Sequence, residues 1–262
     1  MTDFPKGSVW LVGAGPGDPE LLTRKAERLI RAARVVFYDA LVGPGVLALI
    51  PPSARMVPVG KRSGSHSKDQ ASIDRLIVEA ALAGERVVRL KGGDPAIFGG
   101  ATEDLDACRA ANVPVSICPG VTAASAAAAG LSRSLTLRGM ARKLVFATAH
   151  ARNGESLDLD WQALADPGAT LAIYMGKAAA GDIARGLMSA GLCGSTPAAV
   201  IENASLPSEV RISTRLDRLA FAVEAGIGAG PALLLVGQAI GRADAAGSAQ
   251  VANDRVTLAE QP

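Results

Sequence analysis

The chain has 262 residues, of which 49% are hydrophobic, 20% are charged and only 3% are aromatic. This composition excludes a largely disordered protein and predicts a core of Ala, Val, Leu and Ile in one large domain or two medium ones. Lys and Arg number 27 against 25 for Asp and Glu, and this net charge of +2 gives no global basic field for binding a nucleic acid.

The cysteines and the apolar segments bear on where the protein works. Cys108, Cys118 and Cys193 fall into no zinc-ligand or disulfide spacing, which predicts a reducing environment and no metal site. Met1–Ser8 lacks the basic start and long apolar run of a signal peptide, and Leu41–Ile50 is too short and too rich in glycine and proline to span a membrane. We therefore expect a cytoplasmic protein whose partners include neither nucleic acid nor a membrane.

In the first half, short apolar runs alternate with segments of helical periodicity. Strands are expected at Val9–Val12, Val35–Tyr38, Arg55–Val59 and Val87–Leu90, helices at Glu20–Ala33 and Ile73–Ala81, and the unit closes at Pro114–Pro119. This alternation predicts right-handed crossovers and a mostly parallel sheet with helices on both faces.

The second half predicts another α/β unit with a mixed sheet. A helix of small residues is expected at Val121–Gly130, so we place the domain junction near Gly120. The other elements are expected to be strands at Lys143–Ala147, Ala169–Met175, Ala198–Ile201, Glu209–Ser213 and Ala232–Val236, and helices at Lys177–Ala190 and Thr214–Ala225. Residues after Arg242 lack periodicity, so we expect domains at 1–120 and 121–242 and a flexible tail at 243–262.

A glycine-rich loop, Gly13-Ala14-Gly15-Pro16-Gly17-Asp18-Pro19, follows the first expected strand. Its glycines let a ligand approach the backbone, as in dinucleotide-binding proteins. However, Asp18 occupies the position of that fingerprint's third glycine, and the two prolines remove N–H groups that a pyrophosphate needs. A nicotinamide oxidoreductase is therefore the least favoured hypothesis for the function, although Asp39 stands about where such enzymes carry a ribose-binding carboxylate. A tight turn with Asp18 as a helix cap explains the same residues.

Two more glycine turns are candidates for ligand binding, and the first is expected at the carboxyl end of a parallel strand, where open α/β sheets bind ligands. Gly92-Gly93-Asp94 follows the strand Val87–Leu90, and Gly120-Val121-Thr122 leads into the helix of small residues. A carboxylate at this edge accepts hydrogen bonds from ribose hydroxyls and repels phosphate, so Asp94 favours a nucleoside over a nucleotide. Plain structural turns remain the alternative for both segments.

The order of these motifs is more specific than any one of them. Over about residues 8–242 the sequence closely resembles the tetrapyrrole methylases. The segments that carry the resemblance are Gly13–Pro19, Tyr38–Val42, Val59–Arg62, Gly92–Pro95, Gly120–Ala124, Tyr174–Gly176 and Glu202–Ala204. The resemblance implies a two-domain α/β fold, each domain a mostly parallel or mixed sheet flanked by helices, with a ligand cleft between the domains and a homodimeric assembly.

The resemblance also implies S-adenosyl-L-methionine as methyl donor, S-adenosyl-L-homocysteine as product and no metal. Carried over by motif, the cofactor-binding residues are Pro16, Gly92, Gly93, Asp94, Ile97, Thr122, Ala123, Met175 and Ala204. Asp39 matches the proposed proton acceptor of the family, and Lys61 matches its proposed proton donor. The implied reaction is the C-methylation of uroporphyrinogen III, through precorrin-1 to precorrin-2, for siroheme or cobalamin synthesis.

The implied tetrapyrrole substrate carries many carboxylates, which guanidinium groups bind well. Arg138 matches an arginine of the family motif and Glu103 keeps its register, so we expect both to bind substrate. Where close relatives read Phe-Gly-Arg-Gly-Gly-Glu-Glu, this chain reads Phe98-Gly99-Gly100-Ala101-Thr102-Glu103-Asp104, so Gly100 replaces an arginine expected to touch the substrate. This departure leaves two alternatives open. One is a methyltransferase that acts on a different precorrin, and the other is a non-catalytic paralogue that binds tetrapyrrole or S-adenosylmethionine.

Overall fold

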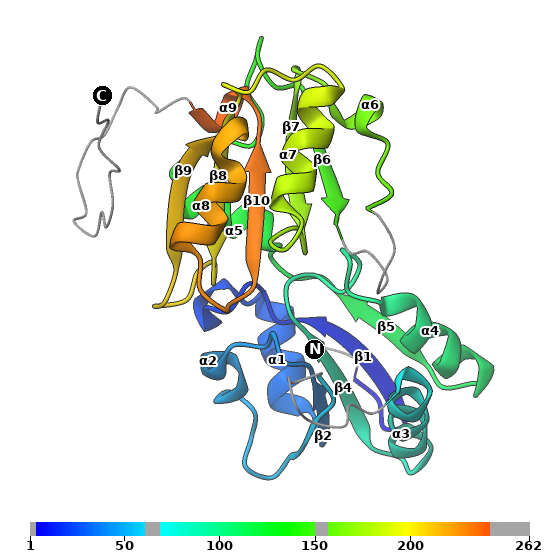
Figure 1. Ribbon diagram of the computed structural model, residues 1–262. Helices are drawn as coiled ribbons and strands as arrows, with labels where there is room; N and C mark the ends of the chain where they lie inside the picture. The colour runs from blue at the N-terminus through cyan, green and yellow to red at the C-terminus, as the bar shows by residue number, and fades with distance from the viewer. Residues whose placement is uncertain (1–3, 61–68, 150–156, 242–262) are drawn as a thin grey trace.

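The computed structural model describes residues 4–60, 69–149 and 157–241, which form two halves that each contain one five-stranded sheet (Figure 1). The first sheet has the strand order β3-β2-β4-β1-β5, and all of its pairings are parallel, as the sequence predicts. Its strands are β1 (Ser8–Gly13), β2 (Val35–Tyr38), β3 (Arg55–Pro58), β4 (Arg86–Lys91) and β5 (Val115–Cys118).

Helices cover both faces of this first sheet. They are α1 (Arg24–Ala32), α2 (Pro44–Leu47), α3 (Gln70–Leu82) and α4 (Ala101–Ala110). Val12 of β1 packs in one buried cluster with residues of α1 and α2, whereas Val9 and Leu11 pack in another with residues of α3 and α4. Because successive side chains of a strand point to opposite faces, β1 contributes to both cores.

The first helix begins later than its periodicity predicts. The expected helix Glu20–Ala33 is a short 3-10 turn at Pro19–Leu21 followed by α1, which starts at Arg24. The hydroxyl oxygen of Thr23 accepts a hydrogen bond from the Ala26 amide at 3.1 Å and so caps α1 at its N-terminus. The sequence also gave no prediction for α4, whose position turns out to matter for the site.

The second sheet is mixed, with the strand order β6-β7-β10-β8-β9. The pair β6–β7 is parallel, and the other pairs are antiparallel. Its strands are β6 (Lys143–Thr148), β7 (Ala169–Tyr174), β8 (Pro197–Glu202), β9 (Val210–Arg215) and β10 (Ala232–Val236). The expectation of a mixed sheet is confirmed.

Helices also flank the second sheet on both faces. They are α5 (Ala123–Gly130), α6 (Trp161–Leu164), α7 (Ala180–Ser189), α8 (Leu219–Gly226) and α9 (Gln238–Gly241). Leu171 and Ile173 of β7 pack with α7 and α8, and Ala172 between them packs with α5 and α9. Each half therefore has three layers, with its sheet in the middle.

Two helix predictions in this half are wrong at their starts. The expected helix Thr214–Ala225 begins at Leu219, because β9 continues to Arg215, which lies opposite Pro197 of β8. The expected helix Lys177–Ala190 begins at Ala180. The expected tail at 243–262 lies outside the described residues. Within the part of the chain that is described, no helix is both long and apolar enough to cross a membrane.

Candidate active site

The carboxyl ends of three parallel strands meet at the junction of the two halves. A glycine lies at or just after the end of each strand, and the backbones of these glycines are in close contact. Gly13 ends β1, Gly93 follows β4 and Gly120 follows β5. A side-chain carbon built on Gly13 would lie 2.6 Å from the Gly120 Cα and 2.7 Å from the Gly93 carbonyl oxygen. These contacts leave no room for a side chain at Gly13, and the edge of the sheet is bare backbone there.

Hydrogen bonds fix two of the loops at this edge to one another. The Gly93 amide donates to the Gly15 carbonyl at 2.7 Å, and the Gly15 amide donates back to the Gly93 carbonyl at 3.2 Å. Both residues have left-handed backbone conformations, with φ of +68° for Gly15 and +67° for Gly93, which glycine adopts without strain. The loop that contains Pro16 is thereby attached to the Gly92-Gly93-Asp94 turn.

Asp94 joins the loops that follow β4 and β5. Its Oδ1 accepts a hydrogen bond from the Ala96 amide at 2.8 Å, and its Oδ2 accepts one from the Gly120 amide at 3.0 Å. Each carboxylate oxygen can accept more than one hydrogen bond, so the half-buried carboxylate can still bind a ligand hydroxyl. Asp94 thus holds the two loops together and is also a candidate for binding a ligand.

The second half brings its own strand ends to the same junction. Thr122 caps α5 by accepting a hydrogen bond from the Ser125 amide at 3.1 Å, and Ala123 is the first residue of that helix. The Tyr174 hydroxyl at the end of β7 accepts a hydrogen bond from the Ala124 amide at 3.3 Å. Burial raises the pKa of Tyr174, so its hydroxyl is neutral at physiological pH.

Several residues at these strand ends have left-handed backbones although they are not glycine. Met175 follows β7 with φ of 55°, and Asn203 and Ser205 flank the buried Ala204 after β8 with φ of 52° and 70°. Each such residue costs about 1–3 kcal/mol and persists only where its surroundings hold it. This concentration of strain at one junction is typical of a functional site.

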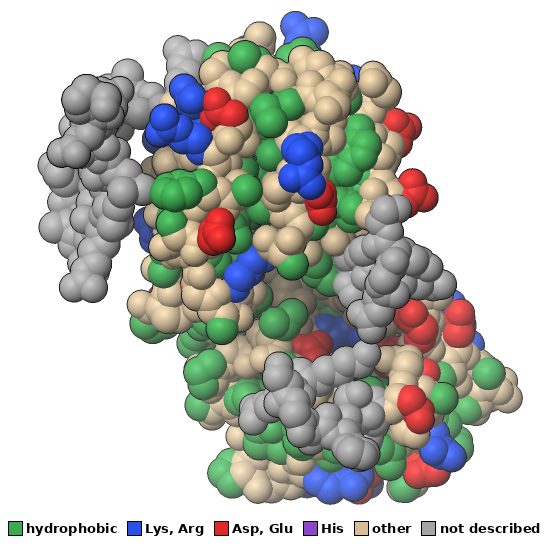
Figure 2. Space-filling model, viewed as in Figure 1, with side chains coloured by type: hydrophobic (Ala, Val, Ile, Leu, Met, Phe, Trp, Pro, Cys, Tyr) green, Lys and Arg blue, Asp and Glu red, His purple; other side chains and the backbone are tan. Residues whose placement is uncertain are grey.

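Contacts between the halves surround the junction. The Asp18 amide donates to the Ser205 hydroxyl at 3.1 Å, and the rings of Phe98 and Tyr174 have centroids 5.1 Å apart. Figure 2 shows the surface hollowed where the two halves meet, with charged side chains of both signs at the floor of the hollow. The strand ends of both sheets therefore face one shared cleft.

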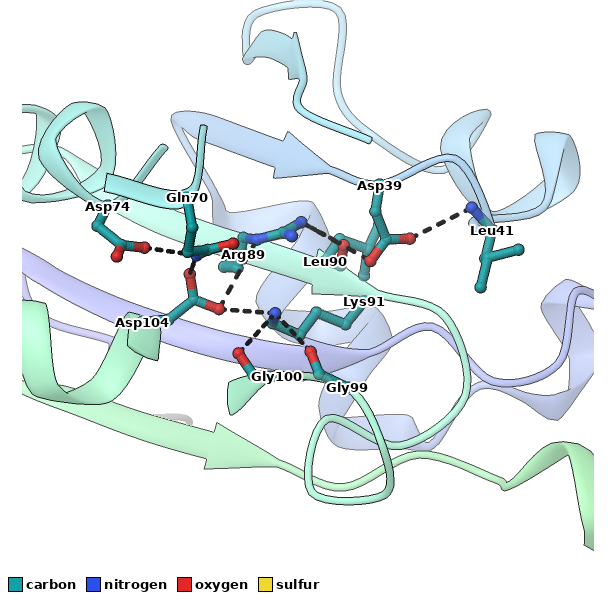
Figure 3. Close-up of polar contacts among 10 residues, drawn as sticks. All are labelled: Asp39, Leu41, Gln70, Asp74, Arg89, Leu90, Lys91, Gly99, Gly100 and Asp104. Atoms are coloured by element: carbon teal, nitrogen blue, oxygen red, sulfur yellow. Dashed lines mark hydrogen bonds and ion pairs between the residues drawn. The ribbon is translucent and has the colours of Figure 1, made fainter. Parts of the chain in front are cut away.

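A cluster of charged side chains lies beside the glycine edge in the first half (Figure 3). Arg89 and Lys91 of β4 are 5% and 3% exposed, and Asp104 of α4 is 1% exposed. Lys91 Nζ lies 2.7 Å from Asp104 Oδ2, and Arg89 lies 3.9 Å from both Asp104 Oδ2 and Asp39 Oδ2. Asp39 is the least buried member, with 24% of its side chain exposed. The buried cations are therefore compensated by carboxylates, as burial of charge requires.

The structure brings most of the predicted site residues to this junction. The residues on the glycine loops and strand ends are Pro16, Asp39, Gly92, Gly93, Asp94, Ile97, Thr122, Ala123, Met175 and Ala204. Glu103 lies exposed in the first turn of α4, with its Oε2 3.5 Å from where a side-chain carbon of Gly100 would be. Lys61 lies outside the described residues.

Arg138 occupies a different place. It is exposed in the turn before β6 and lines a cavity of about 570 Å³ together with Thr136, Leu137, Gly139, Ala141 and Arg142. None of the other predicted site residues lines this cavity.

Sequence reasoning missed the buried group of Arg89, Lys91 and Asp104. The signal was available in β4, where two cations alternate with Val and Leu in a strand that the pattern predicts to be buried. The carboxylate that pairs with these two cations could not be identified, because Asp104 lies on a helix that the sequence did not predict.

Comparisons with known proteins agree on one family. The family model for Tetrapyrrole (Corrin/Porphyrin) Methylases matches residues 8–220. The chain is 45% identical over 238 residues to a uroporphyrinogen-III C-methyltransferase of Paracoccus denitrificans, which covers 91% of this chain and 83% of that protein. It is also 45% identical over 235 residues to a siroheme synthase of Gluconacetobacter diazotrophicus, which covers 89% of this chain and 50% of that protein. The chain thus spans about half the length of this second relative.

A solved structure has the same fold. The uroporphyrin-III C-methyl transferase of Thermus thermophilus, complexed with S-adenyl homocysteine, superposes with a TM-score of 0.74 and 40% sequence identity. The match covers 89% of this chain and 98% of that one.

Proposed function

Because the chain belongs to the tetrapyrrole methylase family, we propose that it is an enzyme that transfers methyl groups from S-adenosylmethionine to carbon atoms of uroporphyrinogen III. The products are precorrin-1 and then precorrin-2, which serve siroheme or cobalamin synthesis. The observation that carries the proposal is the bare glycine edge of the first sheet with the Asp94 carboxylate beside it, facing the strand ends of the second sheet.

The residues at this edge fit S-adenosylmethionine. Nothing lies within 4 Å of a side-chain carbon built on Gly93, so a flat ring has room against the backbone there, and Asp94 supplies an acceptor for ribose hydroxyls. A carboxylate also suits a ligand that carries a sulfonium cation and no phosphate. The residues proposed to hold the cofactor are Pro16, Gly92, Gly93, Asp94, Ile97, Thr122, Ala123, Met175 and Ala204.

Asp39 is proposed to accept a proton during methyl transfer. When bound, S-adenosylmethionine supplies an activated methyl group, and its transfer leaves S-adenosylhomocysteine. A new carbon–carbon bond makes the macrocycle cationic, and loss of a proton restores its neutrality. The Leu41 amide donates to Asp39 Oδ1 at 3.3 Å and Arg89 lies 3.9 Å from Oδ2, so the carboxylate is oriented while part of it remains open to the cleft. Lys61 is proposed as the proton donor on the resemblance alone.

Apolar side chains at the junction are suited to exclude water from the reaction. Leu41, Phe98 and Met175 are 60%, 43% and 49% exposed, although each is large and hydrophobic. Exposed apolar side chains gathered at a cleft are typical of binding surfaces, and a macrocycle that covers them displaces water from the reacting carbon. Glu103 is proposed to bind polar groups of the substrate. Arg138, which lines a separate cavity, is proposed to do so on the resemblance alone.

The proposal includes a domain boundary near Gly120, a homodimeric assembly and a cytoplasmic location. Support for the boundary comes from the position of Gly120, which lies between the last strand of the first sheet and α5. Analytical ultracentrifugation of the purified chain checks the dimer.

Mass analysis of the products tests the function. We expect anaerobic incubation of the protein with S-adenosylmethionine and uroporphyrinogen III to add two methyl groups per macrocycle. Binding of S-adenosylhomocysteine with no methyl transfer would instead identify a non-catalytic paralogue.

Gly100 keeps a second candidate open, namely a methyltransferase for a different precorrin. Gly100 has φ of +60°, and a side-chain carbon built there meets only Glu103 Oε2 at 3.5 Å, so an arginine has room. If the site is an ordinary uroporphyrinogen site that has lost an arginine, Gly100→Arg should raise kcat/KM for uroporphyrinogen III about tenfold, because one charge-assisted hydrogen bond contributes about 1.5–3 kcal/mol. An arginine in the left-handed conformation of residue 100 should lower the free energy of unfolding by about 1–2 kcal/mol.

Gly84→Arg is the matched control for this variant. Gly84 also has a left-handed backbone, with φ of +83°, and has open space around its α-carbon, but it lies at the opposite end of β4. The Gly84→Arg substitution should lower the free energy of unfolding by a similar amount and leave kcat/KM unchanged. A fall in activity for Gly100→Arg alone would indicate a pocket shaped for another macrocycle.

Asp94→Ala is expected to weaken S-adenosylhomocysteine binding about tenfold to a hundredfold. The substitution removes the ribose acceptor and frees the Ala96 and Gly120 amides, and each 1.4 kcal/mol lost corresponds to a factor of ten in Kd. Asp94→Asn keeps one acceptor oxygen and should lose less. Isothermal titration calorimetry measures both variants, with Asp106→Ala on exposed α4 surface as control. An unchanged Kd for Asp94→Ala would remove Asp94 from the site.

A further inference from the structure

Lys91 has an unusual environment for a lysine. It is the last residue of β4, and its side chain is almost completely buried. Its ammonium group donates hydrogen bonds to the carbonyl oxygens of Gly99 at 2.8 Å and Gly100 at 3.2 Å, and forms an ion pair of 2.7 Å with Asp104 (Figure 3). A buried ion pair is often no more stabilising than two apolar side chains, so this pair calls for an explanation other than stability.

The carbonyls that Lys91 binds lie at the far end of the loop that follows β4. This loop, residues 92–100, starts at the Gly92-Gly93-Asp94 turn and returns to the side chain of Lys91. Asp94 holds the beginning of the loop through the Ala96 and Gly120 amides. One carboxylate and one ammonium group therefore fix the two ends of the same loop.

Between these two ends the loop has a strained conformation. Phe98 is strained because it is not a glycine and has φ of 50°. A side chain at Gly99 would overlap the Pro95 carbonyl oxygen, at 2.6 Å, so the loop is also tightly folded. The loop carries Ile97, a proposed cofactor contact, and Phe98, whose ring lies against Tyr174 of the second half. Strained backbone persists only where other groups hold it, and the Lys91 ammonium holds the two carbonyls that directly follow Phe98.

From these contacts we infer that Lys91 is a positioning residue for methyl transfer. Its ammonium, neutralised by Asp104, fixes residues 97–100 so that Ile97 and Phe98 present a preformed surface at the cleft between the halves. The inference rests on the proposed function, because it assigns this loop to the cofactor and substrate site. Lys91 itself acts through the loop, since its own side chain is buried beneath it.

Three substitutions separate positioning from folding. Lys91→Met removes the donor and leaves the buried Asp104 without its closest cation, so this variant loses thermal stability as well. Lys91→Met/Asp104→Asn removes both charges and keeps an acceptor for Gln70, which donates to Asp104 Oδ1 at 3.4 Å. Lys91→Arg retains a cation that can donate to both carbonyls. Arg109→Met, which breaks the exposed Arg109–Asp106 pair on the same helix as Asp104, is the control.

We expect the double variant to recover most of the stability that Lys91→Met loses, while hydrogen exchange of the amides in residues 97–100 stays faster than in the parent protein. Its Kd for S-adenosylhomocysteine should rise several-fold, and its kcat on uroporphyrinogen III should fall about tenfold or more, because small displacements of positioning groups have large effects on rate. Lys91→Arg should restore part of the kcat, and Arg109→Met should match the parent protein throughout.

The inference is overturned if the double variant shows parental exchange, Kd and kcat, since the pair would then have no role in positioning. If Lys91→Met does not fold, the double variant alone decides. Hydrogen exchange and S-adenosylhomocysteine binding do not depend on the substrate. A parent protein that fails to methylate uroporphyrinogen III therefore contradicts the proposed function, while these two measurements still decide the role of Lys91.

Discussion

Gly120→Ala is expected to abolish measurable binding of S-adenosylhomocysteine. A methyl group at this position would overlap the Gly93 carbonyl oxygen and lie 2.9 Å from the Gly13 Cα. Both neighbours are backbone atoms, so neither can rotate away as a flexible side chain could. Relief of the overlap must separate the ends of β1, β4 and β5, which would also break the hydrogen bond from the Gly120 amide to Asp94. Calorimetric titration of the variant measures this loss.

Gly84→Ala provides the comparison for this prediction. Its backbone is left-handed but nothing lies within 4 Å of the added carbon, so it should lose only about 1–2 kcal/mol of stability and keep parental affinity. Thermal unfolding of both variants shows whether Gly120→Ala remains folded. A folded Gly120→Ala protein with parental affinity would show that the ligand does not lie at the glycine edge.

Asp39→Asn is expected to lower kcat by about 10²–10⁴, the usual contribution of a positioned acid or base. The amide keeps an oxygen for the Leu41 N–H but cannot accept the proton that the macrocycle releases. Because Asp39 is not among the proposed cofactor contacts, Kd for S-adenosylhomocysteine should stay near its parental value. Single-turnover product analysis by mass spectrometry measures the rate.

Asp106→Asn, in an exposed ion pair on α4, controls for the general effect of losing a carboxylate. Parental kcat in Asp39→Asn would assign proton removal to solvent or to another residue. A large rise in Kd without a change in kcat would place Asp39 in cofactor binding instead.

The architecture could be predicted from the sequence because strand periodicity and turn residues agree locally. The runs Val35–Tyr38 and Ala232–Val236 are strands at the predicted positions. Helix starts were less predictable, since the cap at Thr23 and the pairing of Arg215 with Pro197 depend on local geometry and on a partner strand. The apolar pattern of α4 is weak, and only Ala101, Asp104 and Cys108 are buried in it, which explains why the sequence did not reveal this helix.

The position of the candidate site residues could be predicted where they belong to a short motif. Gly93 and Asp94 come within three residues of the end of β4 at Lys91, so their place at the sheet edge follows from the fold class. By contrast, the partnership of Lys91 with Asp104 joins a strand to a separate helix, and no local pattern reveals which carboxylate meets a buried ammonium. The proton-handling roles proposed for Asp39 and Lys61 rest on the resemblance, because a lone carboxylate or ammonium after a strand is commonly only a cap or a surface charge.

The strand order of the first sheet has a consequence for the growing polypeptide. β1 is synthesised first but lies inside the sheet, where Val9 is opposite Val87 of β4 and Val115 of β5. One edge of β1 therefore lacks its native partner until the ribosome has released the chain as far as Lys91, and the other edge lacks it until Cys118 is released. By contrast, β8 and β9 pair with each other across a short connection. Unpaired strand edges are templates for aggregation. A nascent chain that stalls before β5 thus exposes one edge of β1, an interior strand of the finished sheet, to other chains.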